Sequence, residues 1–211
     1  MNSLSDLHSN YQQIEKDIGL ASSSKLHEFF VNLIGITPKE YREKGKDVCI
    51  TYGYGDTPFG RALIGRMDKS ICYLAFIDNN QEQVFKSFEE YWGNANLLHD
   101  DVKAHEYLEN IFIKNKKYNL LVKGTDFQIN VWKVLLNLPY GVVATYQDIA
   151  NYRDKPKSVR AVASAIGKNH IAYLIPCHRV IAKSGAMSGY RWGIERKKIL
   201  IASESINKDV K

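Results

Sequence analysis

Three adjacent side chains with reactive chemistry, Cys177, His178 and Arg179, follow the apolar run 171–176. A free thiol has a pKa of about 8.5 and is mostly protonated at neutral pH, whereas its thiolate is a strong nucleophile. Neighbouring cations lower that pKa, and an imidazole can accept the proton. The segment therefore predicts either a nucleophilic cysteine with its base or a buried structural cysteine beside a chance pair of basic residues.

The backbone decides whether the imidazole can reach the thiol. Adjacent side chains on an extended strand point to opposite faces, so His178 reaches the sulfur only if the chain turns or a water molecule intervenes. Pro176 favours such a turn. A catalytic base also needs a group that orients it, and Glu204 in the last predicted helix is the candidate. The pattern alone leaves both interpretations open.

The composition indicates a globular protein with a basic second half. The net charge of +6 divides into −2 for residues 1–123 and +8 for residues 124–211. This asymmetry favours a polyanionic partner such as nucleic acid, or else a solvated basic face. Three scattered cysteines (Cys49, Cys72 and Cys177) show no disulfide framework and no metal-pair spacing. Without a membrane-spanning run or a secretory signal, we expect a cytoplasmic protein that contacts no membrane.

The first half of the chain predicts helices followed by a sheet. Residues 1–44 are predicted to be helical, with Gly35 at a helix end and these apolar residues on one face: Leu26, Phe29, Phe30, Leu33 and Ile34. Residues 47–55, 61–67 and 70–78 predict three antiparallel strands. Helices over 81–92 and 102–112 and a strand over 118–122 are expected to follow.

The second half predicts a series of short capped helices. Thr125 and Gln128 form a capping box before a helix that ends near Leu138, and Thr145 caps the next helix. A third helix is expected over 157–169, then a strand over 171–176, a glycine-rich loop and a helix from 194 to 205. Two short helices in a basic region predict a helix-turn-helix, although tandem capped helices also occur in proteins that bind no nucleic acid.

In this context the motifs "YQDIA", "KSVRAVASAIGKN", "IPCHRVI" and "SGYRWG" resemble the O6-alkylguanine-DNA alkyltransferases, also called methylated-DNA–protein-cysteine methyltransferases. The resemblance covers roughly residues 47–205 and is strongest to the C-terminal part of the bacterial adaptive-response protein. It implies an α+β fold: a small antiparallel-sheet, ribonuclease H-like domain (46–123), then a winged helix-turn-helix-like alkyltransferase domain (124–211). Residues 1–45 resemble a truncated AraC-type helix-turn-helix, expected to pack on the core as a helical extension.

The resemblance also implies a role for each matched residue. Cys177 would accept the alkyl group from guanine O6 in double-stranded DNA. His178 would deprotonate the Cys177 thiol through a water molecule, and Glu204 would orient the imidazole. Tyr146 would press on the target phosphate and assist the departing flipped base. Arg160 would replace that base in the stack, beside Ala161 and Ser164 on a helix that fits the minor groove, and Asn169 would brace the active-site turn. The substrate pocket would be formed by Val180, Tyr190, Arg191 and Trp192.

The family resemblance predicts a monomer that reacts once and needs no cofactor. No metal is expected either, because Cys49, Cys72 and His99 show no persuasive ligand spacing. Trp192 is expected to narrow the pocket and favour methyl over bulky adducts. Three alternatives remain: a DNA-binding transcription regulator of the adaptive-response type, a lesion binder without transfer activity, and a Cys-His hydrolase. Cys177 disfavours the lesion binder, and the absence of a separate His-Asn or His-Asp pattern disfavours the hydrolase.

Overall fold

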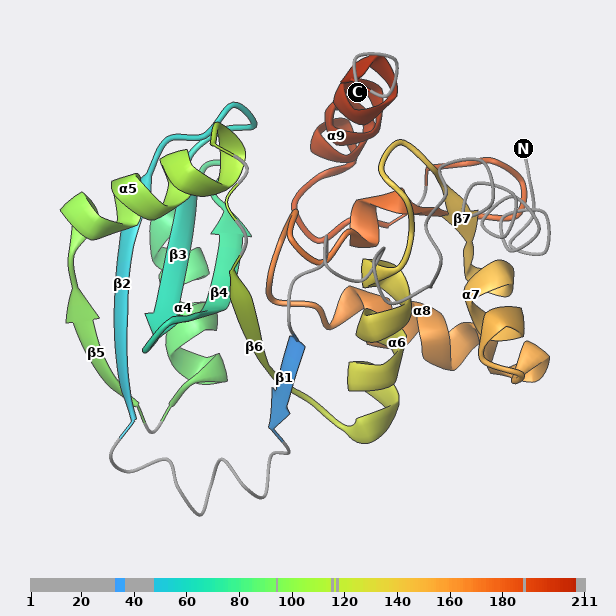
Figure 1. Cartoon of the computed structure of the whole chain (residues 1–211), viewed down its shortest axis with the longest axis horizontal. Coiled ribbons are helices and arrows are strands. Elements are labelled where there is room, and N and C mark those ends of the chain that lie inside the picture. Colours follow the sequence, from blue (N-terminus) through green and yellow to red (C-terminus); the bar gives the residue numbers. More distant parts are fainter. Residues whose placement is uncertain are drawn as a thin grey trace, which may run out of the picture.

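The computed structural model describes residues 33–36, 48–93, 95–114, 116, 118–187 and 189–207. Figure 1 shows a sheet with two helices beside a second group of helices, with β1 and β6 at the side of the sheet that faces this group. The sheet half contains β1 (Leu33–Ile36), β2 (Cys49–Gly55), β3 (Ala62–Met67), β4 (Ser70–Phe76), α4 (Gln81–Tyr91), β5 (Asn96–His99), α5 (Asp101–Phe112) and β6 (Asn119–Lys123).

The second half is built from helices and one small strand pair. It contains α6 (Asp126–Leu136), β7 (Ala144–Thr145), α7 (Tyr146–Tyr152), α8 (Val159–Gly167), β8 (Val180–Ile181) and α9 (Ile194–Asn207). Two 3₁₀ turns, η2 (Pro156–Ser158) and η3 (Cys177–Arg179), precede α8 and β8. This arrangement confirms the predicted α+β class.

The sheet has the order β1-β6-β4-β3-β2-β5. Its central pairs, β2 with β3 and β3 with β4, are antiparallel as predicted. The outer pairs are parallel: β6 lies between β4 and β1, and β5 pairs with β2. Every residue of β4 is buried, as expected for a strand covered on both faces.

Two parts of this sheet differ from the prediction. Leu33 and Ile34 do not lie in a helix, because they form β1 and pair in parallel with Leu120 and Leu121 of β6. Partner strands override a helical apolar spacing when they supply the backbone hydrogen bonds. Strand β5 was not predicted at all. The remaining helical predictions for residues 1–32 and 37–45 lie outside the described residues.

Glycines in β2 and β3 let the two long helices pack closely on opposite faces of the sheet. A Cβ on Gly53 would lie 2.6 Å from the carbonyl oxygen of Asp100 and 2.8 Å from Cβ of Ala104 in α5. A Cβ on Gly65 would lie 2.9 Å from the ring of Phe88 in α4. Small residues at these positions therefore set the distance between sheet and helices.

Local capping signals fix the starts of α6 and α7. The Thr125 hydroxyl accepts from the Gln128 amide, and the Gln128 side chain accepts from the Thr125 amide, as the sequence predicts. Thr145 caps α7 in the same way with Asp148. Helix α6 packs on α8 through the Trp132 indole, whose N–H donates to the Ala165 carbonyl oxygen over 2.9 Å.

The predicted strand over 171–176 is wrong. Ile171 makes a single parallel bridge to Leu74 of β4, after which the chain turns and Tyr173 takes a left-handed conformation with φ +62°. An apolar run of this length indicates burial without specifying backbone form. Four of its residues are buried, so the expected support beneath Cys177 is present as a compact turn.

Adding a methyl group at Gly53 should destabilise the sheet half. We expect Gly53→Ala to lower the free energy of unfolding by about 1–3 kcal/mol, because the new Cβ overlaps backbone atoms of Asp100, the residue that caps α5. Gly93→Ala is the matched control, since its Cβ would lie 3.6 Å from the nearest atom, and we expect a change within about 0.5 kcal/mol. Urea denaturation of both variants would measure this, and equal stability would contradict the packing argument.

Candidate active site

Cys177 begins the 3₁₀ turn η3 directly after Pro176, whose φ of −78° and ψ of 57° turn the chain. The Cys177 amide donates to the Ile175 carbonyl oxygen over 2.7 Å, and the residue is only 6% exposed. The turn expected at Pro176 is therefore present. This turn places the thiol directly after the end of the buried 171–176 segment.

Asn169 holds this turn together through its side-chain amide. Its Oδ1 accepts from the Ile171 amide over 2.8 Å, and its Nδ2 donates to the Ile171 carbonyl oxygen over 3.0 Å. The same Nδ2 lies 3.3 Å from the Ile175 carbonyl oxygen and 3.3 Å from Cys177 Sγ. One buried amide thus connects the end of α8 to the sulfur atom.

The surroundings of Cys177 keep its thiol protonated. Burial raises the pKa of Cys177 to about 11, against the opposing effects of the Asn169 hydrogen bond and the cations Lys197 and Arg191. The adjacent His178 and Arg179 are not among the largest contributions that lower this pKa. A base must therefore remove the proton at the moment of reaction.

His178 follows Cys177 in the turn η3 and is a fully buried imidazole. Its Nε2 is 2.8 Å from Oε1 of Glu204, so the ring proton lies on Nε2 and Nδ1 carries a free lone pair. Nδ1 is buried and has no hydrogen-bond partner among the described residues. Burial lowers the pKa of His178, partly opposed by Glu204, so the ring is neutral at physiological pH and can accept a proton.

Glu204 is a buried carboxylate held by two basic side chains. Arg179 donates from Nε to Oε2 over 2.8 Å and from Nη2 to Oε1 over 2.9 Å, while its Nη1 donates to the Leu138 carbonyl oxygen. The Gly141 amide adds a contact of 3.2 Å. Burial alone would raise the pKa of Glu204, but the hydrogen bonds from His178 and Arg179 lower it to about 2. The predicted orienting role of Glu204 agrees with this geometry, and Arg179 anchors both the carboxylate and the backbone.

Lys197 is a residue of this site that the sequence analysis missed. Its side chain is fully buried, and Nζ donates to the Val180 carbonyl oxygen over 2.6 Å and lies 3.5 Å from that of Gly189. Burial lowers the pKa of Lys197, whereas Cys177 raises it. The available signal was a lysine on the apolar face of the last helix, three residues after Ile194 and three before Leu200.

Two tyrosines complete the surroundings of the thiol. Tyr146 is the first residue of α7 and is half-buried, and its pKa is raised by burial and then by Cys177. Tyr190 has a buried hydroxyl with no partner among the described residues, and its ring centroid lies 6.4 Å from that of His178. The structure thus gathers Tyr146, Tyr190 and Val180 around Cys177 and His178.

The predicted DNA-contacting residues lie on the exposed face of α8. Arg160, Ala161 and Ser164 are exposed, whereas Val162, Ala165 and Ile166 on the opposite face are buried. Lys155, Lys157 and Lys168 are exposed at the two ends of this helix. A helix with small exposed side chains and flanking cations can approach a phosphate backbone closely.

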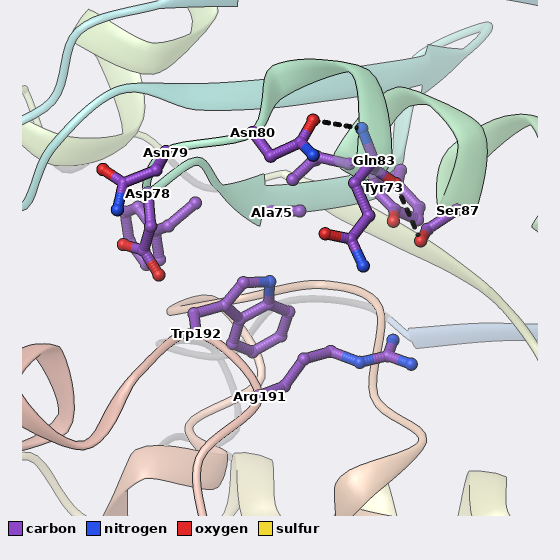
Figure 2. Close-up of a pocket in the computed structure, with 11 residues that line it drawn as sticks. Tyr73, Ala75, Asp78, Asn79, Asn80, Gln83, Ser87, Arg191 and Trp192 are labelled. Atoms are coloured by element: carbon purple, nitrogen blue, oxygen red, sulfur yellow. Dashed lines mark hydrogen bonds between the residues drawn. The ribbon is translucent and has the colours of Figure 1, made fainter.

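Arg191 and Trp192 face the sheet half, where they line a pocket of about 420 Å³. Figure 2 shows both side chains reaching from the loop before α9 toward the β4–α4 segment. Arg196 fixes the same loop, because it donates to the Trp192 carbonyl oxygen and pairs with Asp78 over 2.7 Å. The expected effect of Trp192 on adduct size stays a prediction.

Neither a metal cluster nor a membrane span is found in the part of the chain that the structure describes. There, no three His, Cys, Asp or Glu side chains gather in a way that could hold a metal ion. Among the same residues, no helix is both long enough and apolar enough to cross a bilayer.

Comparison with known proteins gives this geometry a context. The family model "6-O-methylguanine DNA methyltransferase, DNA binding domain" matches residues 126–206. The inducible methylated-DNA–protein-cysteine methyltransferase of Bacillus subtilis is 37% identical over 142 residues, which cover 64% of this chain and 79% of that protein. The chain belongs to this methyltransferase family. The resemblance inferred from its motifs is therefore confirmed.

Two further relatives show how far the similarity extends. The bifunctional transcriptional activator/DNA repair enzyme Ada of Escherichia coli is 33% identical over 196 residues, covering 90% of this chain and 55% of Ada. The chain thus spans about half the length of that relative. The crystal structure of Mycobacterium tuberculosis OGT in complex with DNA superposes with a TM-score of 0.60 at 31% identity, covering 74% of this chain and 93% of that one.

Replacing the arginine that holds Glu204 should lower the free energy of unfolding more than breaking a surface ion pair does. We expect Arg179→Met to lower the free energy of unfolding by about 3–5 kcal/mol, because it leaves a buried carboxylate with one basic partner. Arg61→Met is the control, since Arg61 and Asp56 lie 3.8 Å apart with exposed side chains, and we expect at most about 1 kcal/mol. Chemical denaturation compares the two, and similar losses would contradict the role of Arg179.

Proposed function

We propose that this chain repairs alkylated DNA by direct reversal, moving a methyl or other alkyl group from guanine O6 onto Cys177. The observation that carries the proposal is a buried Cys177 thiol in the same turn as a neutral His178 whose Nε2 is fixed by Glu204. The names of the relatives support the same activity, and the DNA complex of the mycobacterial relative supports DNA as the partner.

The proposed reaction transfers one proton and one alkyl group. The Cys177 proton passes to Nδ1 of His178, directly or through a water molecule, and Glu204 stabilises the imidazolium that forms. The sulfur attacks the alkyl carbon, the carbon–O6 bond breaks, and the electron pair stays on guanine. Tyr146 supplies a proton to the departing base, and its phenol is later reprotonated by the imidazolium or by solvent. The product is a thioether, which is stable, so each molecule reacts once.

A protonated thiol at rest suits a protein that is consumed by a single reaction. A permanent thiolate would react with any soluble electrophile, because thiolate character and access govern cysteine oxidation and alkylation. Here burial holds the pKa at about 11, and only 6% of the residue is exposed. Reaction is then restricted to an alkyl group delivered into the pocket.

Delivery requires that the base leave the duplex, since its O6 is otherwise out of reach of a buried sulfur. We propose that α8 docks in the minor groove, that Arg160 occupies the vacated position, and that Ala161 and Ser164 allow close approach. The exposed lysines around α8 would bind phosphates irrespective of sequence, which a repair protein needs. We further propose that the protein acts as a monomer in the cytoplasm, with a sheet domain at 46–123, to which β1 adds one strand, and a second domain at 124–211.

The second candidate function is a regulatory role like the one in the name of Ada, which is a transcriptional activator as well as a repair enzyme. The match to 90% of this chain includes part of the N-terminal region. Promoter binding by residues 1–45 would be the feature that distinguishes it, and those residues lie almost wholly outside the described ones. Sequence-specific binding without any change in mass would favour regulation alone.

Incubation with a duplex that carries O6-methylguanine tests the proposed transfer. We expect the intact protein to gain the mass of one methylene group, with peptide mapping to Cys177. Cys177→Ala should abolish the gain. Cys49→Ala should retain it, because Cys49 is an exposed residue at the start of β2 and is not part of the site around Cys177. A gain that persists in Cys177→Ala would overturn the assignment of the acceptor.

The rate of transfer should be nearly independent of pH around neutrality. The burial-lowered pKa of His178 keeps the imidazole neutral above its ordinary value of 6.5, and the thiol stays protonated up to about pH 11. The reactive pair is therefore the same from about pH 6.5 to pH 10. Single-turnover rates across this range would show it. A rise centred near 8.5, the ordinary thiol value, would contradict the proton-transfer step.

A further inference from the structure

His170 follows Asn169 but takes no part in the proposed chemistry, although its ring lies in a contact between the two halves. The imidazole stacks on the Tyr91 ring with centroids 3.9 Å apart and an interplanar angle of 25°. On its other side, Nη1 of Arg191 lies 2.8 Å from Nδ1 of His170. The same Nη1 lies 3.3 Å from the Asn169 carbonyl oxygen. His170 thus connects the end of α4 with the loop before α9.

The imidazole acts as an acceptor in this contact. A guanidinium only donates, so the ring nitrogen that pairs with it carries the lone pair. Nη1 is nearer to Nδ1, at 2.8 Å, than to Nε2, at 3.3 Å, and we assign the lone pair to Nδ1 and the ring proton to Nε2. Burial, followed by the cations Arg191 and Lys123, lowers the pKa of His170 to about 3, and the ring is neutral at physiological pH. None of the ion pairs found among the described residues joins Arg191 to a carboxylate. His170 and the Asn169 carbonyl are therefore its anchoring acceptors.

His170 itself is fixed to the sheet by backbone and ring contacts. The Leu74 amide donates to the His170 carbonyl oxygen over 3.0 Å, and the Ala172 amide donates to the Leu74 carbonyl oxygen over 2.7 Å. The stacking partner is equally fixed, because the Tyr91 hydroxyl donates to the Lys123 carbonyl oxygen over 2.7 Å and accepts from the Lys123 amide over 3.0 Å. Strands β4 and β6 thus hold the imidazole in place.

The segment that Arg191 belongs to has a flexible backbone at both ends. We call residues 189–193 the pocket loop: Gly189 and Gly193 bound it with φ of 54° and 89°. Such glycines adopt many backbone conformations, so side-chain contacts must fix the loop. From α9, Lys197 contacts the Gly189 carbonyl oxygen and Arg196 contacts that of Trp192. The contact between Arg191 and His170 fixes the middle of the loop from the opposite side.

We propose that His170 is a positioning residue for alkyl transfer: it holds Arg191 and thereby fixes the pocket loop, with Tyr190, at the distance from Cys177 that the flipped base requires. The inference rests on the proposed function. It gives the sheet half a part in catalysis, since the imidazole that anchors the loop is itself held by β4, β6 and Tyr91. Arg191 acts here through its side chain on loop geometry, and its guanidinium is engaged with protein rather than with DNA phosphate.

Two substitutions separate the hydrogen bond from the stacking. His170→Asn places an acceptor oxygen near the position of Nδ1 but removes the ring, whereas His170→Phe keeps a stacking ring and removes the acceptor. Arg191→Met removes the donor and keeps the apolar stem. Each variant is mixed in excess with duplex DNA that carries O6-methylguanine, over a range of protein concentrations. The measurements are the saturating transfer rate, the half-saturating concentration and the melting temperature.

We expect His170→Phe and Arg191→Met to lower the saturating rate by roughly ten- to a hundredfold, with an unchanged half-saturating concentration, as a loosened pocket predicts. His170→Asn should retain a rate within about threefold of the parent, since the acceptor that positions the loop is kept. The double variant His170→Phe/Arg191→Met should be no slower than either single variant, because both remove the same contact. Similar melting temperatures would show that the rates do not reflect unfolding.

Three results would overturn the inference. Full activity of His170→Phe would show that the contact is dispensable. Equal losses in His170→Asn and His170→Phe would assign the effect to packing. An Arg191→Met variant that changes only the half-saturating concentration would identify Arg191 as a phosphate contact. Absence of transfer by the parent protein is a different outcome, because it overturns the proposed function and the positioning role together.

Discussion

The Glu204 carboxylate is buried between an imidazole and a guanidinium, and the geometry around Cys177 depends on that cluster. A buried carboxylate without partners would become protonated or would unfold its surroundings. With Arg179 and His178 as donors, its pKa is about 2 and it remains charged. The charge then fixes the His178 ring and its tautomer, which leaves Nδ1 as the basic nitrogen of that ring. Three elements meet at this carboxylate: α9, η3 and the turn that follows α6.

Burial shifts the pKa values of the thiol and its base in opposite directions, and it keeps both groups uncharged. Burial raises the pKa of Cys177 and lowers that of His178, so each group is neutral at rest. Two neutral partners cost less to bury than an ion pair. In the proposed reaction the charged state would form only transiently, when Glu204 can stabilise the imidazolium. Lys197 and Asn169 would add stabilisation for developing negative charge on sulfur.

Local signals in the sequence predicted much of the fold. The capping residues Thr125 and Thr145 act within one turn, and their helices begin where the sequence indicates. Other elements depend on partners far along the chain. Leu33 and Ile34 form a strand because β6 offers its edge, and 171–176 turns because Asn169 supplies hydrogen bonds to its backbone. Lys197 was missed because a buried lysine is explained only by carbonyl groups that another element presents.

The single bridge between Leu74 and Ile171 has a consequence for the order in which the molecule can assemble. Helices α6 and α7 contain their own caps, and α6 packs on α8, so these helices can form from local contacts. The turn that carries Cys177 is different, because its backbone docks on β4, which is far away in sequence. Contacts of this kind form late, since closing a long loop must precede them. A helical half released from its sheet would therefore retain the exposed face of α8 while its sulfur lost a defined position.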